Sequence, residues 1–249
     1  MFDDVCYKTS FLTHVVVRID FVAPFTAFDK NIPPTILKSI LNRFPIAEPQ
    51  DSISQRIEVS QAGVKQEERH GKQWNFFGKE REKQLTIQPG DCSITYSKYS
   101  RFEDLTDEFR VAVAAIDEAA KDTFAKRFGL RYINQFEFDE LNLATLKSYI
   151  QEELLGTLPF KAYTRNLTRN FHIVELKFDD IDVRFQYGFP NNDFPAVIRR
   201  PIFVIDIDAY SATVHTVGES VGCVKTAHEH IQRLFEESIT DELRRKLNG

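Results

Sequence analysis

The two halves of the chain repeat one order of strand-like and helix-like segments, and this order constrains the fold more than any single motif. Each half begins with an alternating strand pattern, continues with one helical and four further strand patterns, and ends with a longer helical pattern. The order β-α-β4-α in residues 1–126 and again in 127–249 predicts two tandem units packed as one body. Antiparallel strands connected in this way make an α+β protein, with helices on one face of a curved, mostly antiparallel sheet.

In the first half, apolar residues alternate with other residues along 15–21, which predicts a half-buried strand. Pro33 and Pro34 suit the start of the helix that follows, and Ser100 with Glu103 forms a capping box before the long helix. The turn signal "QPGD" predicts that the last two strands form a hairpin. The four strand patterns lie at 52–60, 72–79, 83–90 and 92–100.

The second half opens with the strand pattern "GLRYINQFEF" at 129–138. A helical pattern follows at 142–156, where Gly156 is a suitable C-cap. Thr226 and Glu229 form a candidate capping box for the last helix. The two halves share little sequence, so the predicted repeat depends on element order. The four strand patterns between the two helices lie at 161–168, 170–178, 181–189 and 201–210.

Two resemblances accompany these patterns. The duplicated element order resembles the fold of the TATA-binding protein, which is a tandem duplication of this kind. The strand "GLRYIN", the acidic strand "IDIDAY" and a closing helix with His228, Phe235 and Glu236 resemble a sporadically distributed family of uncharacterised prokaryotic proteins. The second resemblance covers nearly the whole chain and implies a bacterial or archaeal origin without a known activity. Its sporadic distribution implies mobile or defence-linked genes, and neither resemblance assigns a function.

The composition is ordinary for a globular protein except for its phenylalanines. Charged residues make up 28% and hydrophobic residues 42% of the 249 residues, with 22 Phe beside a single Trp. A formal net charge of −5 argues against broad nonspecific affinity for nucleic acid. Cys6, Cys92 and Cys223 lack the spacing of a disulfide framework or a zinc site. Since neither a signal-peptide pattern nor a bilayer-spanning apolar run occurs, we expect a cytoplasmic protein without membrane contact.

An amide interrupts the apolar face of the strand at 129–138. Asn134 shares that face with Leu130 and Tyr132, while Arg131 lies on the other face. We expect Asn134 to be a buried, hydrogen-bonded polar group, because an unpaired buried amide costs about 1–3 kcal/mol. A bulge after Gly129 would instead turn it outward beside Arg131, and a ligand contact is the remaining alternative.

Asp206 and Asp208 in "FVIDIDAY" are the candidate metal ligands. They project from the same face of one strand, roughly 7 Å apart, so both could reach one Mg²⁺ or Mn²⁺ ion. Carboxylate clusters of this kind hold the metal in phosphoryl chemistry. The simpler alternative needs no cofactor: the two carboxylates face solvent or basic partners. The other face of the strand then packs on the helices through Phe203, Ile205, Ile207 and Ala209.

Gly218, Ser220 and Gly222 match the GxSxG pattern of a nucleophile elbow. That pattern requires a strand–turn–helix at the top of a parallel sheet, with an acid and a histidine later in the chain. His228 and His230 follow at once in the next helix, so a loop before that helix is the favoured interpretation. The two histidines lie about 200° apart around the helix and cannot chelate one metal from it.

Basic and aromatic residues interleave on the predicted strands, which would suit base stacking and phosphate contacts. Acidic residues are equally near, and alternating aromatic residues also build cores, so nucleic-acid binding is an alternative hypothesis. The interleaved residues are Lys79, Arg81, Lys83, Arg165, Arg169, Arg199 and Arg200, with Trp74, Phe76, Tyr96 and Tyr99. The candidate binding residues are Arg131, Asn134, Arg184 and Tyr187.

No candidate catalytic constellation meets the structural requirement of its motif. The sequence therefore favours a non-catalytic scaffold that acts through a partner protein, in a mobile-element or defence context. Two alternatives stay open. A nucleic-acid-binding module would use the concave face of the sheet, and a divalent-metal-dependent phosphodiesterase or nuclease would be centred on Asp206 and Asp208.

Overall fold

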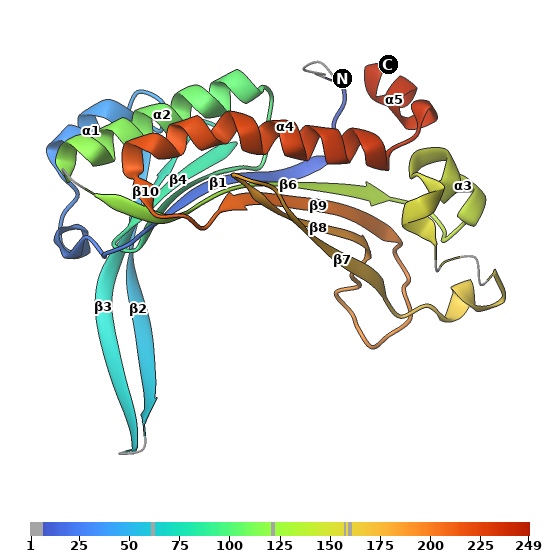
Figure 1. The fold of residues 1–249 in the computed structure, drawn as a ribbon, viewed down its shortest axis with the longest axis horizontal. Coiled ribbons are helices and arrows are strands. Elements are labelled where there is room, and N and C mark those ends of the chain that lie inside the picture. Colours follow the sequence, from blue (N-terminus) through green and yellow to red (C-terminus); the bar gives the residue numbers. More distant parts are fainter. Residues whose placement is uncertain (1–6, 61–62, 121–122, 157, 159–160) are drawn as a thin grey trace. The chain divides into compact units, whose positions relative to one another are not determined.

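The computed structural model describes residues 7–60, 63–120, 123–156, 158 and 161–249. They form a mixed α+β structure with five α-helices and ten strands in one sheet (Figure 1), which confirms the predicted fold class. None of the described helices is both long and apolar enough to span a membrane. The strands are β1 (Leu12–Phe21), β2 (Ile46–Ser60), β3 (Gly63–Phe77), β4 (Lys83–Gln88), β5 (Asp91–Tyr96), β6 (Phe124–Glu137), β7 (Asn170–Lys177), β8 (Asp182–Phe189), β9 (Ile202–Ser211) and β10 (His215–Thr216).

One compact unit, here the hairpin unit, consists of Val16–Phe128 and Ala212–Cys223. Its strands follow the order β2-β3-β4-β5-β1-β6, with β10 beside β6. Helices α1 (Pro34–Ile40) and α2 (Phe102–Ala119) cover one face of these strands (Figure 1). The predicted hairpin of β4 and β5 is present. Strands β2 and β3 are longer than predicted and pair over 15 residues each, so they extend as an arm beyond β4 (Figure 1).

The other compact unit, here the terminal unit, consists of Met1–Val15, Gly129–Ser211 and Val224–Gly249. Its strands follow the order β1-β6-β9-β8-β7, so β1 and β6 are divided between the two units. Helix α4 (Ser220–Ser238) runs along one face of β6 and β9 (Figure 1). The other helices are α3 (Leu143–Tyr149) and α5 (Asp241–Asn248). The predicted division into 1–126 and 127–249 stays a prediction.

Period-two and period-3.6 apolar patterns produce the core in both units. In the hairpin unit, Ile19 on β1 and Phe109 and Ile116 on α2 are fully enclosed. In the terminal unit, Ile205 and Ile207 on β9 are enclosed in the same way. These are the residues that the sequence patterns place on the inner faces, because burying apolar area is the main favourable term in folding.

The tandem repeat is not confirmed, because one of the strands predicted in the second half does not form. Residues Lys161–Asn166 form a 3-10 helix where the sequence predicts a strand. The polar run "TRN" lacks the alternating apolar residues that would hold such a segment in a sheet. The helix predicted at 142–156 also ends early, at Tyr149, and a second 3-10 turn follows.

Both predicted capping boxes are wrong. Ser100 hydrogen-bonds the Asp104 carboxylate instead of a backbone N–H, and Arg101 is the N-cap of α2. Thr226 lies inside α4, which starts earlier than predicted. The capping box that does form joins Thr216 and Glu219 in the 3-10 turn before α4. The Glu219 carboxylate accepts from the Thr216 backbone N–H, which lowers its pKa.

Candidate functional site

Charged side chains of β7, β8 and β9 face one another in register on one face of the terminal unit. Asp208 lies opposite Arg184, which lies opposite Glu175 on β7. Arg184 Nε donates to Glu175 Oε1 at 2.8 Å. The next row places Asp182 opposite Lys177, whose Nζ donates to Asp182 Oδ1 at 2.7 Å. We call these rows of alternating charge the charge rows, and the face that carries them the open face.

Asp206, one of the two candidate metal ligands, is already engaged by a cation. Its carboxylate is 5% exposed and accepts from Arg131 through Nε at 2.7 Å and Nη2 at 2.5 Å. These hydrogen bonds raise the pKa of the Arg131 guanidinium. A divalent cation at Asp206 would have to displace that guanidinium. Among the described residues, no three His, Cys, Asp or Glu side chains gather as a metal site. The metal hypothesis therefore stays a prediction.

The four candidate binding residues divide between the two faces of the sheet. Arg131 bonds Asp206 on β9, and Arg184 lies opposite Asp208 on the same strand, so both arginines lie on the open face. Strand alternation turns Asn134 and Tyr187 to the opposite face. There the Tyr187 ring stacks on the ring of His172, with centroids 5.0 Å apart. The arrangement does not bring the four residues together as one surface.

Asn134 lies in the apolar layer, as the alternating pattern predicts. Its side chain is 4% exposed between the buried Tyr132 and Phe136. The alternation of buried residues continues through this stretch, which excludes the bulge that would turn Asn134 outward. Every buried side-chain polar atom of the described residues has a hydrogen-bond partner. Next to it, Tyr132 Oη lies 3.2 Å from His228 Nδ1 of α4, so this histidine makes a structural contact.

Ser220 of the GxSxG pattern lies at the start of α4 and is fully buried. His215 Nε2 is 2.8 Å from its Oγ, and His215 Nδ1 is 2.8 Å from the Thr213 carbonyl oxygen. The carbonyl requires a proton on Nδ1, so Nε2 accepts the Ser220 hydroxyl proton. This pair has the hydrogen bonding of a nucleophile and base. However, no substrate atom can approach an enclosed hydroxyl, and the bond joins β10 to α4.

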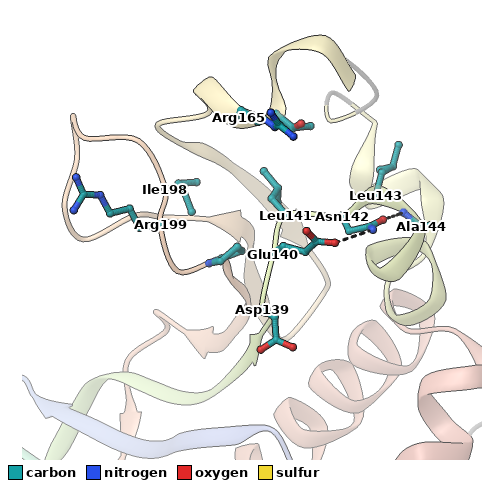
Figure 2. A pocket seen from close by; sticks show the side chains of 11 residues that line it. Asp139, Glu140, Leu141, Asn142, Leu143, Ala144, Arg165, Ile198 and Arg199 are labelled. Carbon is teal, nitrogen blue, oxygen red and sulfur yellow. Dashed lines mark hydrogen bonds between the residues drawn. The ribbon is translucent and has the colours of Figure 1, made fainter.

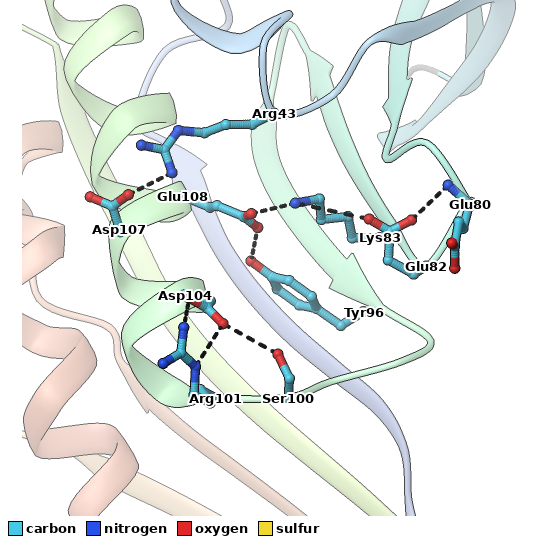
Figure 3. A network of polar contacts seen from close by, with 10 residues as sticks. All are labelled: Arg43, Glu80, Glu82, Lys83, Tyr96, Ser100, Arg101, Asp104, Asp107 and Glu108. Atoms are coloured by element: carbon cyan, nitrogen blue, oxygen red, sulfur yellow. Dashed lines mark hydrogen bonds and ion pairs between the residues drawn. The ribbon is translucent and has the colours of Figure 1, made fainter.

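Four of the interleaved basic and aromatic residues of the hairpin unit have side-chain partners within that unit. Lys83 forms an ion pair with Glu108, whose Oε2 also accepts from Tyr96 Oη at 2.7 Å (Figure 3). Burial raises the pKa of Tyr96. Arg81 pairs with Glu48, and Trp74 Nε1 donates to the Phe28 carbonyl oxygen at 2.8 Å. The nucleic-acid hypothesis stays a prediction, and these contacts give it no additional support.

A pocket of about 690 Å³ lies beside the start of α3 (Figure 2). Asn142 Oδ1 in this pocket accepts from the Ala144 N–H at 2.9 Å and so caps α3. Asn142 Nδ2 donates to Glu140 Oε1 at 3.3 Å (Figure 2). The side chain of Asn142, which lines the pocket, therefore stabilises the start of the helix. Other residues that line it are Asp139, Leu141, Leu143, Thr164, Arg165, Ile198, Arg199 and Pro201.

Strand β7 is the last strand in the sheet order of the terminal unit, and it carries exposed apolar residues at its centre. Ile173 is 58% exposed and Val174 is 36% exposed. The two side chains point to opposite faces of the strand. Single exposed apolar residues are normal, but two β-branched residues on both sides of an outer strand form a continuous apolar edge.

The hydrogen-bond phase of the β7–β8 hairpin determines which backbone groups of β7 point outward. Phe178 N donates to Ile181 O at 3.0 Å, so these two residues form a hydrogen-bonded pair. Such pairs alternate with non-hydrogen-bonded pairs along an antiparallel ladder. The pair of Val174 with Phe185 is consequently hydrogen-bonded. The residues whose N–H and C=O groups point away from β8 are Phe171, Ile173, Glu175 and Lys177.

We call these four positions the free edge of β7. Among the described residues, no hydrogen bond from another segment reaches their backbone groups. Their side chains all lie on the open face, since they are opposite Gly188, Gln186, Arg184 and Asp182 of β8. The free edge thus has main-chain donors and acceptors that no other described strand uses. Its first half, Phe171 and Ile173, is apolar, and its second half, Glu175 and Lys177, is charged.

Ile173 and Val174 are not among the candidate functional residues that the sequence indicates. The run "FHIVEL" was one of four strand patterns without a position in the sheet. The sequence signal for this edge is the pair of adjacent β-branched residues Ile173 and Val174. Neighbouring residues of a strand point to opposite faces, so both can be exposed when the strand lies at the edge of a sheet.

No protein-family model and no curated protein matches this chain.

Proposed function

We propose that the protein binds a partner protein by accepting an extended segment of that partner along the free edge of β7. The observation that carries this proposal is the combination of outward backbone groups and exposed apolar side chains on the outermost strand of the terminal unit. In strand addition of this kind, main-chain hydrogen bonds provide affinity and alternate side chains provide specificity.

Protein edges are normally protected against such pairing. Short strands, prolines and charged side chains at the edge are the usual devices. β7 has eight residues and no proline, and its charges lie in one half only, at Glu175 and Lys177. The other half presents Phe171 and Ile173, so a partner segment would cover apolar surface there. Such an edge favours selective pairing over indiscriminate aggregation, because the charged half disfavours unmatched strands.

The test is to remove one outward N–H without removing a bond to β8. Ile173→Pro does this, since the Ile173 N–H points away from the ladder and proline is tolerated at such edge positions. Ile173→Thr is the matched control, because it keeps the N–H and a β-branched side chain. We expect proteins recovered from the source organism with the wild type and with Ile173→Thr to be lost with Ile173→Pro.

Hydrogen exchange of the recovered complex then locates the contact. In the free protein, the amides of Ile173 and Glu175 should exchange quickly, whereas the ladder-bonded amides of Val174 and Leu176 should be protected. In the complex, the Ile173 and Glu175 amides should become protected as well. Equal recovery with Ile173→Pro, or protection confined to another surface, would refute the proposal.

A further inference from the structure

We infer that the segment bound at the free edge of β7 continues the antiparallel pairing of β7, β8 and β9. It then reads, from its N-terminus, acidic, basic, apolar and apolar at alternate positions. This inference rests on the proposed function and specifies its partner by chemistry. It follows from the charge rows, which cross the sheet strand by strand and stop at β7.

The first charge row alternates in sign across three strands. Asp208 on β9, Arg184 on β8 and Glu175 on β7 are opposite one another. Arg184 and Glu175 make a direct hydrogen bond, with both side chains about half exposed. Opposite charges on directly facing residues stabilise strand pairing, and like charges destabilise it. The next strand of this row should therefore present a basic side chain to Glu175.

The second charge row requires the opposite sign. Tyr210, Asp182 and Lys177 face one another across β9, β8 and β7. Lys177 Nζ is 2.7 Å from Asp182 Oδ1, and its side chain is 83% exposed. An acidic side chain in the added strand would place a carboxylate on the free side of this ammonium. Since Lys177 follows Glu175 along β7, an antiparallel partner reaches Lys177 first.

The other half of the free edge is apolar. Ile173 faces Gln186, and Phe171 faces Gly188 on β8. Gly188 has no Cβ because one would lie 2.2 Å from the Asn170 carbonyl oxygen, and its φ is +119°. The open face therefore has no side chain beside Phe171 on β8. Apolar side chains of the partner opposite these two residues would cover the exposed Ile173 and the half-buried Phe171.

A second copy of this chain does not fit the same edge. Antiparallel pairing of β7 with itself aligns the outward residues in three registers of large overlap. One places Ile173 opposite Glu175, one places Glu175 opposite Glu175, and one places Glu175 opposite Phe171. Each register either faces like charges or covers a carboxylate with apolar surface, which costs free energy. The free edge is thus complementary to a different segment rather than to itself.

The probe is a synthetic peptide with blocked ends that carries aspartate, lysine, valine and leucine at alternate positions, in that order, with threonine between them. The control peptide exchanges the aspartate and the lysine and has the same composition. Fluorescence anisotropy measures the affinity of the full chain for each. Two matched pairs in place of two repulsive ones should give roughly tenfold tighter binding of the matched peptide, about 1.4 kcal/mol.

Variants of the chain separate this inference from the proposed function. Glu175→Gln/Lys177→Gln should bind both peptides equally, because the charges that distinguish them are gone. Ile173→Pro should lose both, whereas Ile173→Thr should retain the preference for the matched peptide. A further result would be that the wild type binds both peptides equally and Ile173→Pro binds neither. That result would refute the inferred charge pattern of the partner segment but would agree with strand addition at β7. No binding of the matched peptide, or binding that survives Ile173→Pro, would overturn the inference; partner recovery with Ile173→Pro still tests the proposed function.

Discussion

Two clusters of charged residues, one in each unit, differ in how completely their partners are supplied within the chain. In the hairpin unit, Glu108 is buried and receives both Lys83 and Tyr96, so its acceptor capacity is used inside the fold. In the terminal unit, Glu175 and Arg184 are about half exposed and belong to a row that ends at an outer strand. We call the first cluster closed, because its charged groups find their partners inside the fold. We call the second cluster open, because its charged side chains are partly exposed to solvent.

The two clusters should contribute differently to stability and to partner binding. A charge removed from water must find its partners in the fold, since an uncompensated buried charge is costly. An exposed ion pair contributes little to stability because water and salt screen it. The closed cluster should therefore determine stability, and the open one should determine which segments can pair with β7.

Glu108→Ala tests the closed cluster and should have the largest effect. The substitution leaves the Lys83 ammonium, 16% exposed, and the buried Tyr96 hydroxyl without their shared acceptor. Breaking a buried pair in this way typically costs about 3–5 kcal/mol. Urea unfolding followed by circular dichroism measures the loss. Glu108→Gln, which keeps an acceptor oxygen for Tyr96, should lose less. A loss below about 1 kcal/mol for Glu108→Ala would show that the cluster is not closed.

Proline substitutions along β7 test the phase of the free edge. Val174→Pro removes an N–H that pairs with β8 and leaves the facing carbonyl oxygen without its donor, which should cost about 1–3 kcal/mol. Ile173→Pro removes an outward N–H that bonds no other described strand, so its cost should be smaller. The same urea unfolding measurement compares the two variants, which differ by one position. If Ile173→Pro lowers the free energy of unfolding more than Val174→Pro does, the assignment is wrong. The even-numbered residues of β7 would then be the ones whose N–H and C=O groups point away from β8.

Periodicity alone predicts most of the fold but not the position of each strand in the sheet. Alternation identifies β1 and β8, because buried apolar residues alternate with more exposed residues along much of each strand. The strand predicted at 161–168 does not form, and the sequence of this segment lacks a sustained apolar alternation. Local patterns also misplaced both capping boxes, since several polar residues near each helix start can satisfy the same N–H groups.

The sequence predicts the candidate site less completely than it predicts the fold. The acidic pair Asp206 and Asp208 was identified correctly as sharing a face, but the ion pair of Asp206 with Arg131 joins residues 75 positions apart. The free edge depends on which strand ends the sheet and on the hydrogen-bond phase of one hairpin. The position of β7 at the edge depends on pairing between strands that are far apart in the sequence, and the phase depends on the geometry of the hairpin. Neither can be predicted from a short stretch of sequence.

Tyr7→Phe tests a closed cluster in the terminal unit and should have an intermediate effect. Tyr7 Oη donates to the buried Glu236 carboxylate, which Arg244 Nε also contacts at 2.8 Å. Loss of this hydrogen bond to a carboxylate should cost about 1.5–3 kcal/mol at neutral pH. Comparable stability of Tyr7→Phe and wild type would mean that Arg244 alone satisfies Glu236.

The same variant has a distinct alkaline signature. Burial, and then the Glu236 carboxylate, raise the pKa of Tyr7 above its ordinary value of 10.0. Because the folded-state pKa is the higher one, the stabilisation is fully present below about pH 10 and is lost as the pH rises further. Unfolding free energies measured from pH 8 upward should therefore decline more steeply for the wild type than for Tyr7→Phe.

A double-mutant cycle on Glu175→Ala and Arg184→Ala tests the open cluster and should show the smallest effect. The coupling free energy between these exposed side chains should be about 0.2–1 kcal/mol in low salt, and it should fall as ionic strength rises. Urea unfolding of the four proteins at two salt concentrations measures it. A coupling as large as the loss in Glu108→Ala would mean that the charge rows are part of the stabilising framework. A small, salt-sensitive coupling free energy would mean that the Glu175–Arg184 contact is weak. Both charges could then form ion pairs with an added strand at little cost in stability.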